Sequence, residues 1–289
     1  MEGLLVRIPS TGGAELALRL WRNERADAPV ALVVPAMGAP GKFYAPYARR
    51  LHAAGLHAAV LDLRGQGESA PRPRRGIDAG YRELAEDDLP AAVRAVRAEL
   101  PGAPVVLAGH SLGGQLALLS AAAAPERSVR AVVLTAAGSV WWRGFGGPLG
   151  VRNLAGSQLF AAASTLLGHW PGERLGFGGR QFPGVMRDWA RQGRTGSYRL
   201  KGSGTDYEAA LAGLALPVLA VEVEHDVLAP PGAVRHLLDK LPAAPVDRWT
   251  YTDAMAGGKR LDHFRWVRHS DALAAHIAHW IGTTLRGGI

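Results

Sequence analysis

The sequence predicts an α/β fold in which a mostly parallel, eight-stranded sheet is flanked by helices. Three observations lead to this prediction. Short apolar runs alternate with helical stretches along most of the chain. The central runs, such as VALVV and AVVLT, are apolar at every position, which is typical of parallel strands covered on both faces. With 289 residues, 48% of them hydrophobic and 20% charged, the chain is long enough to bury one large core.

The expected strands are short runs rich in apolar residues. They are Leu4–Ile8, Leu16–Trp21, Val30–Pro35, Ala58–Leu63, Val105–Ala108, Val129–Thr135, Val218–Val223 and Arg248–Thr252. The expected helices lie between the strands, and most end at proline or glycine signals. They are Phe43–Ala54, Tyr81–Leu100, Leu112–Ala124, Ala233–Leu241 and Asp271–Leu285. In such sheets the loops at the carboxyl ends of the strands usually carry the chemistry.

Residues 138–210 interrupt this alternation and show only short helical patterns. The segment is rich in Gly, Trp and Arg, and a long insertion between two core strands is usually functional. We therefore expect a cap inserted into an α/β core, whose two parts are residues 1–137 and 211–289. Nine basic and two acidic residues between Trp141 and Lys201 give the insertion nearly all of the chain's net charge of +8.

Composition excludes several function classes. Cysteine is absent, which removes disulfides, zinc–thiolate sites, iron–sulfur clusters and a cysteine nucleophile. No basic helix or recognition motif accompanies the positive charge, so we expect no nucleic-acid partner. No apolar run approaches the ~18 residues that a membrane-spanning helix needs, and residues 1–10 lack a signal-peptide pattern. We therefore expect a cytoplasmic protein; the sequence does not predict its oligomeric state.

The segment Gly109-His110-Ser111-Leu112-Gly113 matches the pattern G-x-S-x-G. An apolar strand precedes it and an Ala/Leu-rich helix follows, which is the setting that a nucleophile elbow requires. The two glycines allow a tight turn that raises Ser111 above the sheet edge, and the helix N-terminus behind it favours a developing negative charge. The alternative is a glycine-rich connection with an incidental serine. We expect Ser111 to be a nucleophile.

A serine hydroxyl needs a positioned base before it becomes nucleophilic. His263 follows the last expected strand and a Gly-Gly turn, and it is the expected base, with His269 as its rival. The acid that orients the imidazole should follow another strand. Asp226 lies where the run VLAVEV gives way to a Val-Leu-Ala-Pro-Pro turn, and Glu224 is its competitor. The order serine, acid, histidine along the chain is typical of one fold in particular.

These residues resemble the α/β-hydrolase superfamily, and the resemblance covers essentially the whole chain. Among subgroups, the chain is most similar to uncharacterised bacterial α/β-hydrolases with monoglyceride-lipase-like and serine-aminopeptidase-like relatives. The resemblance implies an α/β-hydrolase fold with Ser111 as nucleophile, Asp226 as acid, His263 as base, and no cofactor or metal. The stretch Asp62–Ser69 is similar to the family's D-x-R-G-x-G-x-S motif, which implies a structural role for that loop. Residues 138–210 match the family's cap position.

The family often carries His-Gly after its third strand, where a backbone N–H enters the oxyanion hole. Here Pro35 and Ala36 replace that pair. A main-chain donor does not depend on its side chain, and by position we expect the N–H groups of Met37 and Leu112 to form the hole. If Ala36 cannot adopt a conformation that glycine allows, one of these donors would be badly aimed.

The aromatic side chains of the insertion either pack it onto the core or line an apolar pocket. The expected substrate-binding residues are Trp141, Trp142, Met186 and Trp189. The sequence thus predicts a serine hydrolase that cleaves a small-molecule carboxylic ester through an acyl-enzyme. Two alternatives stay open: a thioesterase or acyltransferase with an acyl carrier partner at the basic cap, and a non-hydrolytic binding protein on the same fold. The basic charge is equally explained by a solvated, arginine-rich surface.

Overall fold

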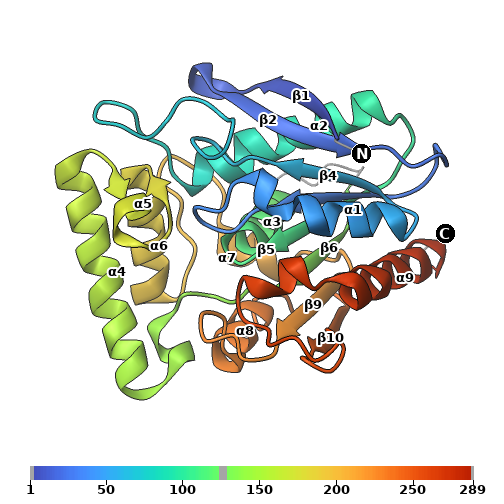
Figure 1. The fold of residues 1–289 in the computed structure, drawn as a ribbon. Coiled ribbons are helices and arrows are strands. Elements are labelled where there is room, and N and C mark those ends of the chain that lie inside the picture. Colours follow the sequence, from blue (N-terminus) through green and yellow to red (C-terminus); the bar gives the residue numbers. More distant parts are fainter. Residues whose placement is uncertain (1–2, 124–128, 288–289) are drawn as a thin grey trace.

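The computed structural model describes residues 3–123 and 129–287 of the chain. One eight-stranded sheet runs through it in the order β1-β2-β4-β3-β5-β6-β9-β10 (Figure 1). Its strands are β1 (Leu4–Pro9), β2 (Glu15–Trp21), β3 (Val30–Val34), β4 (His57–Leu61), β5 (Val105–His110), β6 (Val129–Thr135), β9 (Val218–Val223) and β10 (Val246–Tyr251). The pairs β1–β2 and β2–β4 are antiparallel, and the remaining neighbours pair in parallel. The predicted mostly parallel sheet is therefore confirmed.

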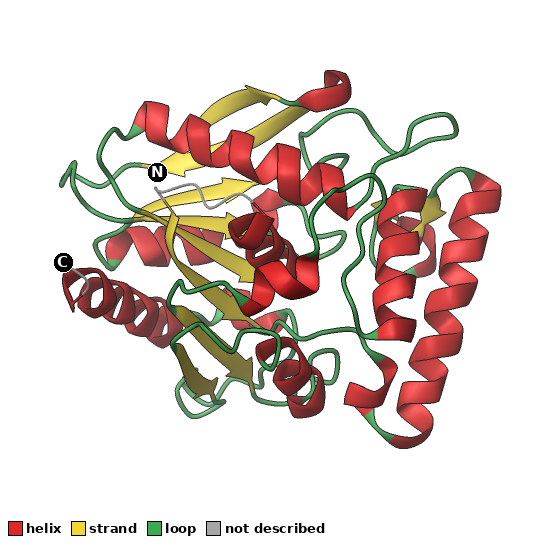
Figure 2. Cartoon of the chain, turned by 180° about the vertical axis from the view of Figure 1, so that it is seen from behind, coloured by secondary structure: helices red, strands yellow, loops and turns green. Residues whose placement is uncertain are grey.

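Helices cover both faces of this sheet (Figure 1, Figure 2). One face carries α1 (Ala45–Ala53) and α9 (Asp271–Gly287), and the other carries α2 (Leu89–Glu99), α3 (Leu112–Ala123), α7 (Tyr207–Ala212) and α8 (Pro231–Leu238). Strand β3 shows why its run is apolar at every position. Val30, Leu32 and Val34 pack in the layer that contains α3, whereas Ala31 and Val33 pack in the layer that contains α1.

Most predicted elements differ from the observed ones only at their ends. β3 stops at Val34, since Pro35 has no N–H to donate to the ladder. β5 extends to His110, which still pairs with a residue of β6. The helix expected over Tyr81–Leu100 contains a π-helical turn before α2 begins. The helix expected over Leu112–Ala124 is α3, and the last residue of that prediction lies outside the described residues.

Residues 138–210 leave the sheet after β6 and return to it at β9. Their longest element is α4 (Gly147–Leu167), of 21 residues, which packs against α6 (Pro183–Thr195). Both helices stand to one side of the core, at the left of Figure 1. Between them in sequence lie β7 (Trp170–Pro171), α5 (Gly172–Leu175) and β8 (Arg180–Gln181). The insertion is thus a largely helical layer beside the sheet.

The expectation of only short helical patterns in this insertion was wrong, and the composition of α4 explains why. A surface helix usually separates its apolar and polar faces. In α4, however, Ala161 and Ser164 are buried while Leu159 and Leu166 are 65% and 75% exposed, and Arg152 is its only charged residue. Apolar side chains therefore surround the helix and leave no periodicity to detect. No helix in the described part of the chain, α4 included, has the length and hydropathy needed to cross a membrane.

Candidate active site

Ser111 lies in the tight turn between β5 and α3, as the G-x-S-x-G pattern predicts. The two flanking glycines are required by close contacts. A Cβ at Gly113 would lie 2.0 Å from the carbonyl oxygen of Val34, and one at Gly109 would lie 2.4 Å from the backbone of Gly114. Any larger residue would push α3 away from the sheet. The glycines therefore hold the start of α3 directly against the ends of β3 and β5.

Backbone strain marks the same edge of the sheet. Among the described residues, three that are not glycine have a left-handed backbone: Ser111 (φ +53°), Ala136 (φ +50°) and His225 (φ +63°). They follow the carboxyl ends of β5, β6 and β9, which are neighbours in the sheet. Each such residue costs on the order of 1–3 kcal/mol and tends to occur where function demands one geometry. The conformations thus point to the edge that the sequence predicted to be functional.

The structure brings Asp226 and His263 into direct contact. Nδ1 of His263 lies 2.9 Å from Oδ1 and 2.8 Å from Oδ2 of Asp226, and both side chains are buried. The carboxylate is held in turn, because its Oδ1 accepts hydrogen bonds from the N–H groups of Leu228 and Ala229. A carboxylate at Nδ1 requires the proton of a neutral imidazole to sit on that nitrogen. The lone pair of His263 is therefore on Nε2.

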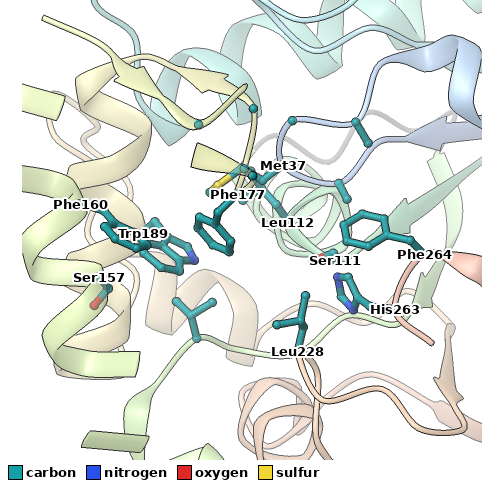
Figure 3. Close-up of a pocket in the computed structure, with 18 of the residues that line it drawn as sticks. Met37, Ser111, Leu112, Ser157, Phe160, Phe177, Trp189, Leu228, His263 and Phe264 are labelled. Carbon is teal, nitrogen blue, oxygen red and sulfur yellow. The ribbon is translucent and has the colours of Figure 1, made fainter. Parts of the chain in front are cut away.

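Ser111 and His263 line one cavity, and Figure 3 shows the imidazole beside the serine. The two residues come from the loops after β5 and after β10, and Asp226 comes from the loop after β9. Neither rival, His269 nor Glu224, lines this cavity. The carboxylate of Glu224 accepts a hydrogen bond from a backbone N–H after β10. The geometry favours Asp226 and His263 over both alternatives.

The two expected oxyanion donors also lie on the cavity wall. Leu112 is the first residue of α3, so its N–H has no acceptor within the helix. Met37 lies in the turn after β3. Ala36 is not among the described residues with a left-handed backbone, so this turn needs no glycine at position 36. The replacement of His-Gly by Pro35-Ala36 therefore leaves the turn in an ordinary conformation.

The cavity has a volume of about 800 Å³ and lies between the core and the insertion, which both line it. Its walls are mostly apolar. The core contributes Leu228 and Phe264 beside the His263 ring, as Figure 3 shows. Most polar side chains on the wall come from α4 and α5, and they are Arg152, Asn153, Ser157 and Glu173; Gln115 lies on α3. Such a site suits a mainly apolar ligand with a few polar anchors.

Of the four expected substrate-binding residues, only Trp189 lies on this wall, and the other three lie elsewhere. Trp141 stacks on the ring of His236 with centroids 4.2 Å apart. Trp142 lies beside Arg143, whose guanidinium carbon is 5.2 Å from its ring centroid. Met186 is fully buried in the packing between α4 and α6. Trp141 thus packs the insertion onto α8 of the core, and Trp142 and Met186 pack within the insertion.

Two aromatic residues of the cavity wall were not predicted. Phe160 and Phe177 lie 5.5 Å apart by ring centroids, and each also packs near Trp189. A sequence signal for Phe160 existed in the helical spacing of Arg152, Gly156 and Phe160, all of which line the cavity. That spacing becomes visible only once α4 is known to be a helix. Phe177 lies in a glycine-rich turn and carries no comparable signal.

The loop over Asp62–Ser69 holds the surrounding structure and does not reach the cavity. The carboxylate of Asp62 accepts hydrogen bonds from the N–H groups of Gly41 and Glu68, and burial raises the pKa of Asp62. The hydroxyl of Ser69 donates to the carbonyl of Asp62 and accepts from the N–H of Ala17. These contacts fit the structural role that the family resemblance implies for this loop.

Only one cluster among the described residues has the spacing of metal ligands. It consists of Glu224, His225 and Asp253, with Nε2 of His225 3.2 Å from Oδ2 of Asp253. None of the three lines the cavity, and the cluster is open to solvent. Acidic groups gather on surfaces without an ion, so this cluster does not by itself indicate a metal centre. The cavity wall itself carries no such group of ligands in the part of the chain that is described.

Comparisons with known proteins agree with this architecture. Residues 26–169 match the family model of the serine aminopeptidase, S33 group, and no curated protein matches the sequence. Solved structures that are similar over nearly the whole chain include a thermophilic esterase from Thermogutta terrifontis (18% identity, 97% of this chain and 99% of that one, TM-score 0.65). A putative aryl esterase from Burkholderia cenocepacia is 15% identical over 98% of this chain and 100% of that one (TM-score 0.63). An esterase from Rhodococcus sp. is 18% identical over 97% of this chain and 99% of that one (TM-score 0.61). At these identities the likeness to the solved structures is one of fold.

Proposed function

The chain belongs to the α/β-hydrolase superfamily as an esterase-like hydrolase, and from that premise we propose that it cleaves carboxylic esters of small molecules through a covalent acyl-enzyme. The proposal assigns Ser111 as nucleophile, His263 as general base and acid, and Asp226 as the residue that orients His263. The observation that carries it is the Asp226–His263 contact beside a strained serine on an apolar cavity. Residues 138–210 would act as a cap over a core made of residues 1–137 and 211–289.

Acylation starts at the serine hydroxyl. Nε2 of His263 takes the proton of Ser111 while Oγ attacks the ester carbonyl carbon. The negative charge passes to the carbonyl oxygen, which the N–H groups of Met37 and Leu112 would bind. The charge on Asp226 stabilises the imidazolium that forms. The tetrahedral intermediate collapses when the bond to the alkoxide breaks and Nε2 of His263 gives that oxygen its proton, which leaves an acyl-serine and an alcohol.

Deacylation uses the same groups in the reverse order. Nε2 of His263 takes a proton from water, and the hydroxide oxygen attacks the acyl carbon of the ester on Ser111. The second tetrahedral intermediate collapses with departure of the serine oxygen, which regains a proton from His263. The product is a carboxylic acid and the enzyme is restored. Every proton and electron pair that moves in these two steps comes from Ser111, His263, the ester or water.

The walls of the cavity support an ester with an apolar acyl or aromatic group. Phe160, Phe177 and Trp189 face this space from the insertion, whereas the polar side chains of the wall lie mainly on α4 and α5. A thioesterase or acyltransferase remains the second candidate because the basic surface of the insertion would attract an acidic acyl carrier protein. The two candidates differ in the leaving group, not in the nucleophile.

A substrate panel tests the proposed function. Purified protein is given p-nitrophenyl esters of increasing acyl length and thioesters of the same acyl chains, free and on a carrier protein. We expect a higher kcat/KM for the free esters than for thioesters with the same acyl group. Preference for the carrier-bound thioester would instead establish the second candidate. Absence of both turnover and covalent labelling by a fluorophosphonate would establish a binding protein on this fold.

Trp189 provides a test of where the acyl group binds. Its replacement by alanine removes an indole wall that packs near Phe160 and Phe177. The loss of about 1–2 kcal/mol of apolar contact predicts an approximately five- to thirtyfold rise in KM for aromatic or medium-chain esters. The acetyl ester has the shortest acyl chain of the series and should be affected much less. Steady-state kinetics across the ester series measure this difference.

Trp141→Ala is the matched control, since Trp141 belongs to the same insertion but packs on His236 outside the cavity. This control should leave the chain-length preference as in the wild type. If both tryptophan variants change the preference equally, the effect comes from a loosened insertion, and the acyl group does not lie against Trp189.

A further inference from the structure

The hydroxyl of Tyr44 connects two segments of the site. Tyr44 ends the short helical turn after β3 and is fully buried. Its Oη accepts a hydrogen bond from the N–H of Ala36 at 2.9 Å and lies 2.7 Å from Nδ1 of His110. Ala36 directly precedes Met37, and His110 directly precedes Ser111. One phenol therefore contacts the residue before the expected oxyanion donor and the residue before the expected nucleophile.

The direction of one hydrogen bond is fixed, and the direction of the other goes with the tautomer of His110. The N–H of Ala36 can only donate, so the Tyr44 oxygen accepts there, and its single proton can go to Nδ1 of His110. In that arrangement Nδ1 of His110 is unprotonated, and the proton of a neutral imidazole sits on Nε2, a buried atom with no hydrogen-bond partner among the described residues. Burial raises the pKa of Tyr44, which keeps the phenol protonated. Burial, with a smaller contribution from the charge of His263, lowers the pKa of His110 well below its usual value.

The neutral state of His110 matters because of its neighbour. The rings of His110 and His263 have centroids 4.9 Å apart, and His110 also packs against Trp266 at 5.1 Å. A second cation at this distance would oppose the imidazolium that His263 must become during catalysis. A hydroxyl that donates to Nδ1 of His110 excludes a proton from that atom. A hydrogen bond donated by Tyr44 would thus act in the same direction as burial, which keeps His110 uncharged beside His263.

We propose that Tyr44 is a positioning residue of the active site: its hydroxyl fixes the Ala36–Met37 backbone for oxyanion binding and holds His110 as the neutral Nε2–H tautomer beside His263. The inference rests on the proposed serine-esterase function. It also gives a reason why Pro35-Ala36 serves in place of His-Gly in this chain. Ala36 donates its N–H to the Tyr44 hydroxyl, and this contact holds the turn in one geometry.

The chain offers a matched pair of tyrosines for the test. Tyr47 is one turn further on, is also fully buried, and its hydroxyl has no hydrogen-bond partner among the described residues. Tyr44→Phe removes both hydrogen bonds, whereas Tyr47→Phe removes a hydroxyl that makes none. We expect Tyr44→Phe to lower kcat for ester hydrolysis, and the rate of fluorophosphonate labelling of Ser111, by about ten- to a hundredfold, with little change in KM. Tyr47→Phe should behave as the wild type.

The tautomer is read directly by nitrogen-15 NMR of the histidine rings. In the wild type we expect Nδ1 of His110 to show the shift of an unprotonated, hydrogen-bonded nitrogen, and to keep it through the pH range in which exposed histidines titrate. His110→Asn assigns the signal by its loss. In Tyr44→Phe the Nδ1 resonance should move and report a mixture of tautomers, and in Tyr47→Phe it should not move. The wild-type spectrum reports the tautomer of His110 without any substitution, so this test remains valid even if a variant folds poorly.

The outcomes separate this proposal from the proposed function. Equal kcat and labelling rates in Tyr44→Phe and Tyr47→Phe overturn the positioning role, as does a wild-type spectrum with a proton on Nδ1 of His110. A wild-type protein that neither turns over esters nor reacts with the fluorophosphonate overturns the esterase function and the catalytic part of this inference with it. The nitrogen spectrum still decides the tautomer in that case. A loss of kcat confined to Tyr44→Phe, together with the expected spectrum, establishes both.

Discussion

Replacement of Ser111 by alanine removes the atom that forms the covalent bond, and we expect kcat for ester hydrolysis to fall by on the order of 10⁴- to 10⁶-fold. The folded structure should persist, because alanine keeps the Cβ and loses only an oxygen that faces the cavity. Its left-handed backbone has the same cost for either side chain. Hydrolysis rates and mass spectrometry after fluorophosphonate treatment measure the loss of both turnover and the covalent adduct.

Ser69→Ala serves as the control for this prediction. Ser69 is also buried and also lies in a glycine-rich motif, but its hydroxyl bridges the backbone of Ala17 and Asp62. Loss of these two hydrogen bonds should lower the free energy of unfolding by about 1–3 kcal/mol and leave the labelling of Ser111 intact. Covalent labelling that persists in Ser111→Ala would show that another residue is the nucleophile.

The parts of this molecule that sequence reasoning reached are those with local physical signatures. The run VALVV predicts a strand covered on both faces, since each of its residues packs in one of two apolar layers. The turn at Ser111 has its own signature because the glycines around it are required by contacts shorter than a Cβ permits. Their positions after strands predict Asp226 and His263 as site residues, and the structure brings them into contact.

The parts that sequence reasoning missed depend on contacts between distant segments. Helix α4 was overlooked because Leu159 and Leu166 are exposed apolar residues, which erases its periodicity. Residue type alone predicts Trp141 as a cavity residue, yet it packs on His236, 95 positions away in the chain. Tyr44 has no motif of its own. Its role becomes visible only when Ala36 and His110 are seen to share its hydroxyl.

Substitution of Asp226 by asparagine should be nearly as damaging as loss of the nucleophile, with an expected fall in kcat on the order of 10⁴-fold. Asparagine has the same shape, and its oxygen can still accept the N–H groups of Leu228 and Ala229. The amide NH₂, however, would then face Nδ1 of His263 as a donor. Nδ1 would have to accept, so the imidazole proton would move to Nε2, where His263 can no longer take a proton from Ser111.

Glu224→Gln distinguishes this explanation from a general loss of negative charge near the site. Glu224 lies two residues before Asp226, and its carboxylate accepts the backbone N–H of Asp253 instead of contacting His263. Removal of this charge should leave kcat close to the wild-type value, while thermal unfolding shows that both variants are folded. An equal fall in kcat in the two variants would mean that catalysis depends on the negative charge of the loop and not on the contact between Asp226 and His263. A loss confined to Asp226→Asn means that the tautomer of His263 is set by the carboxylate of Asp226, because of the two acids only Asp226 contacts the imidazole.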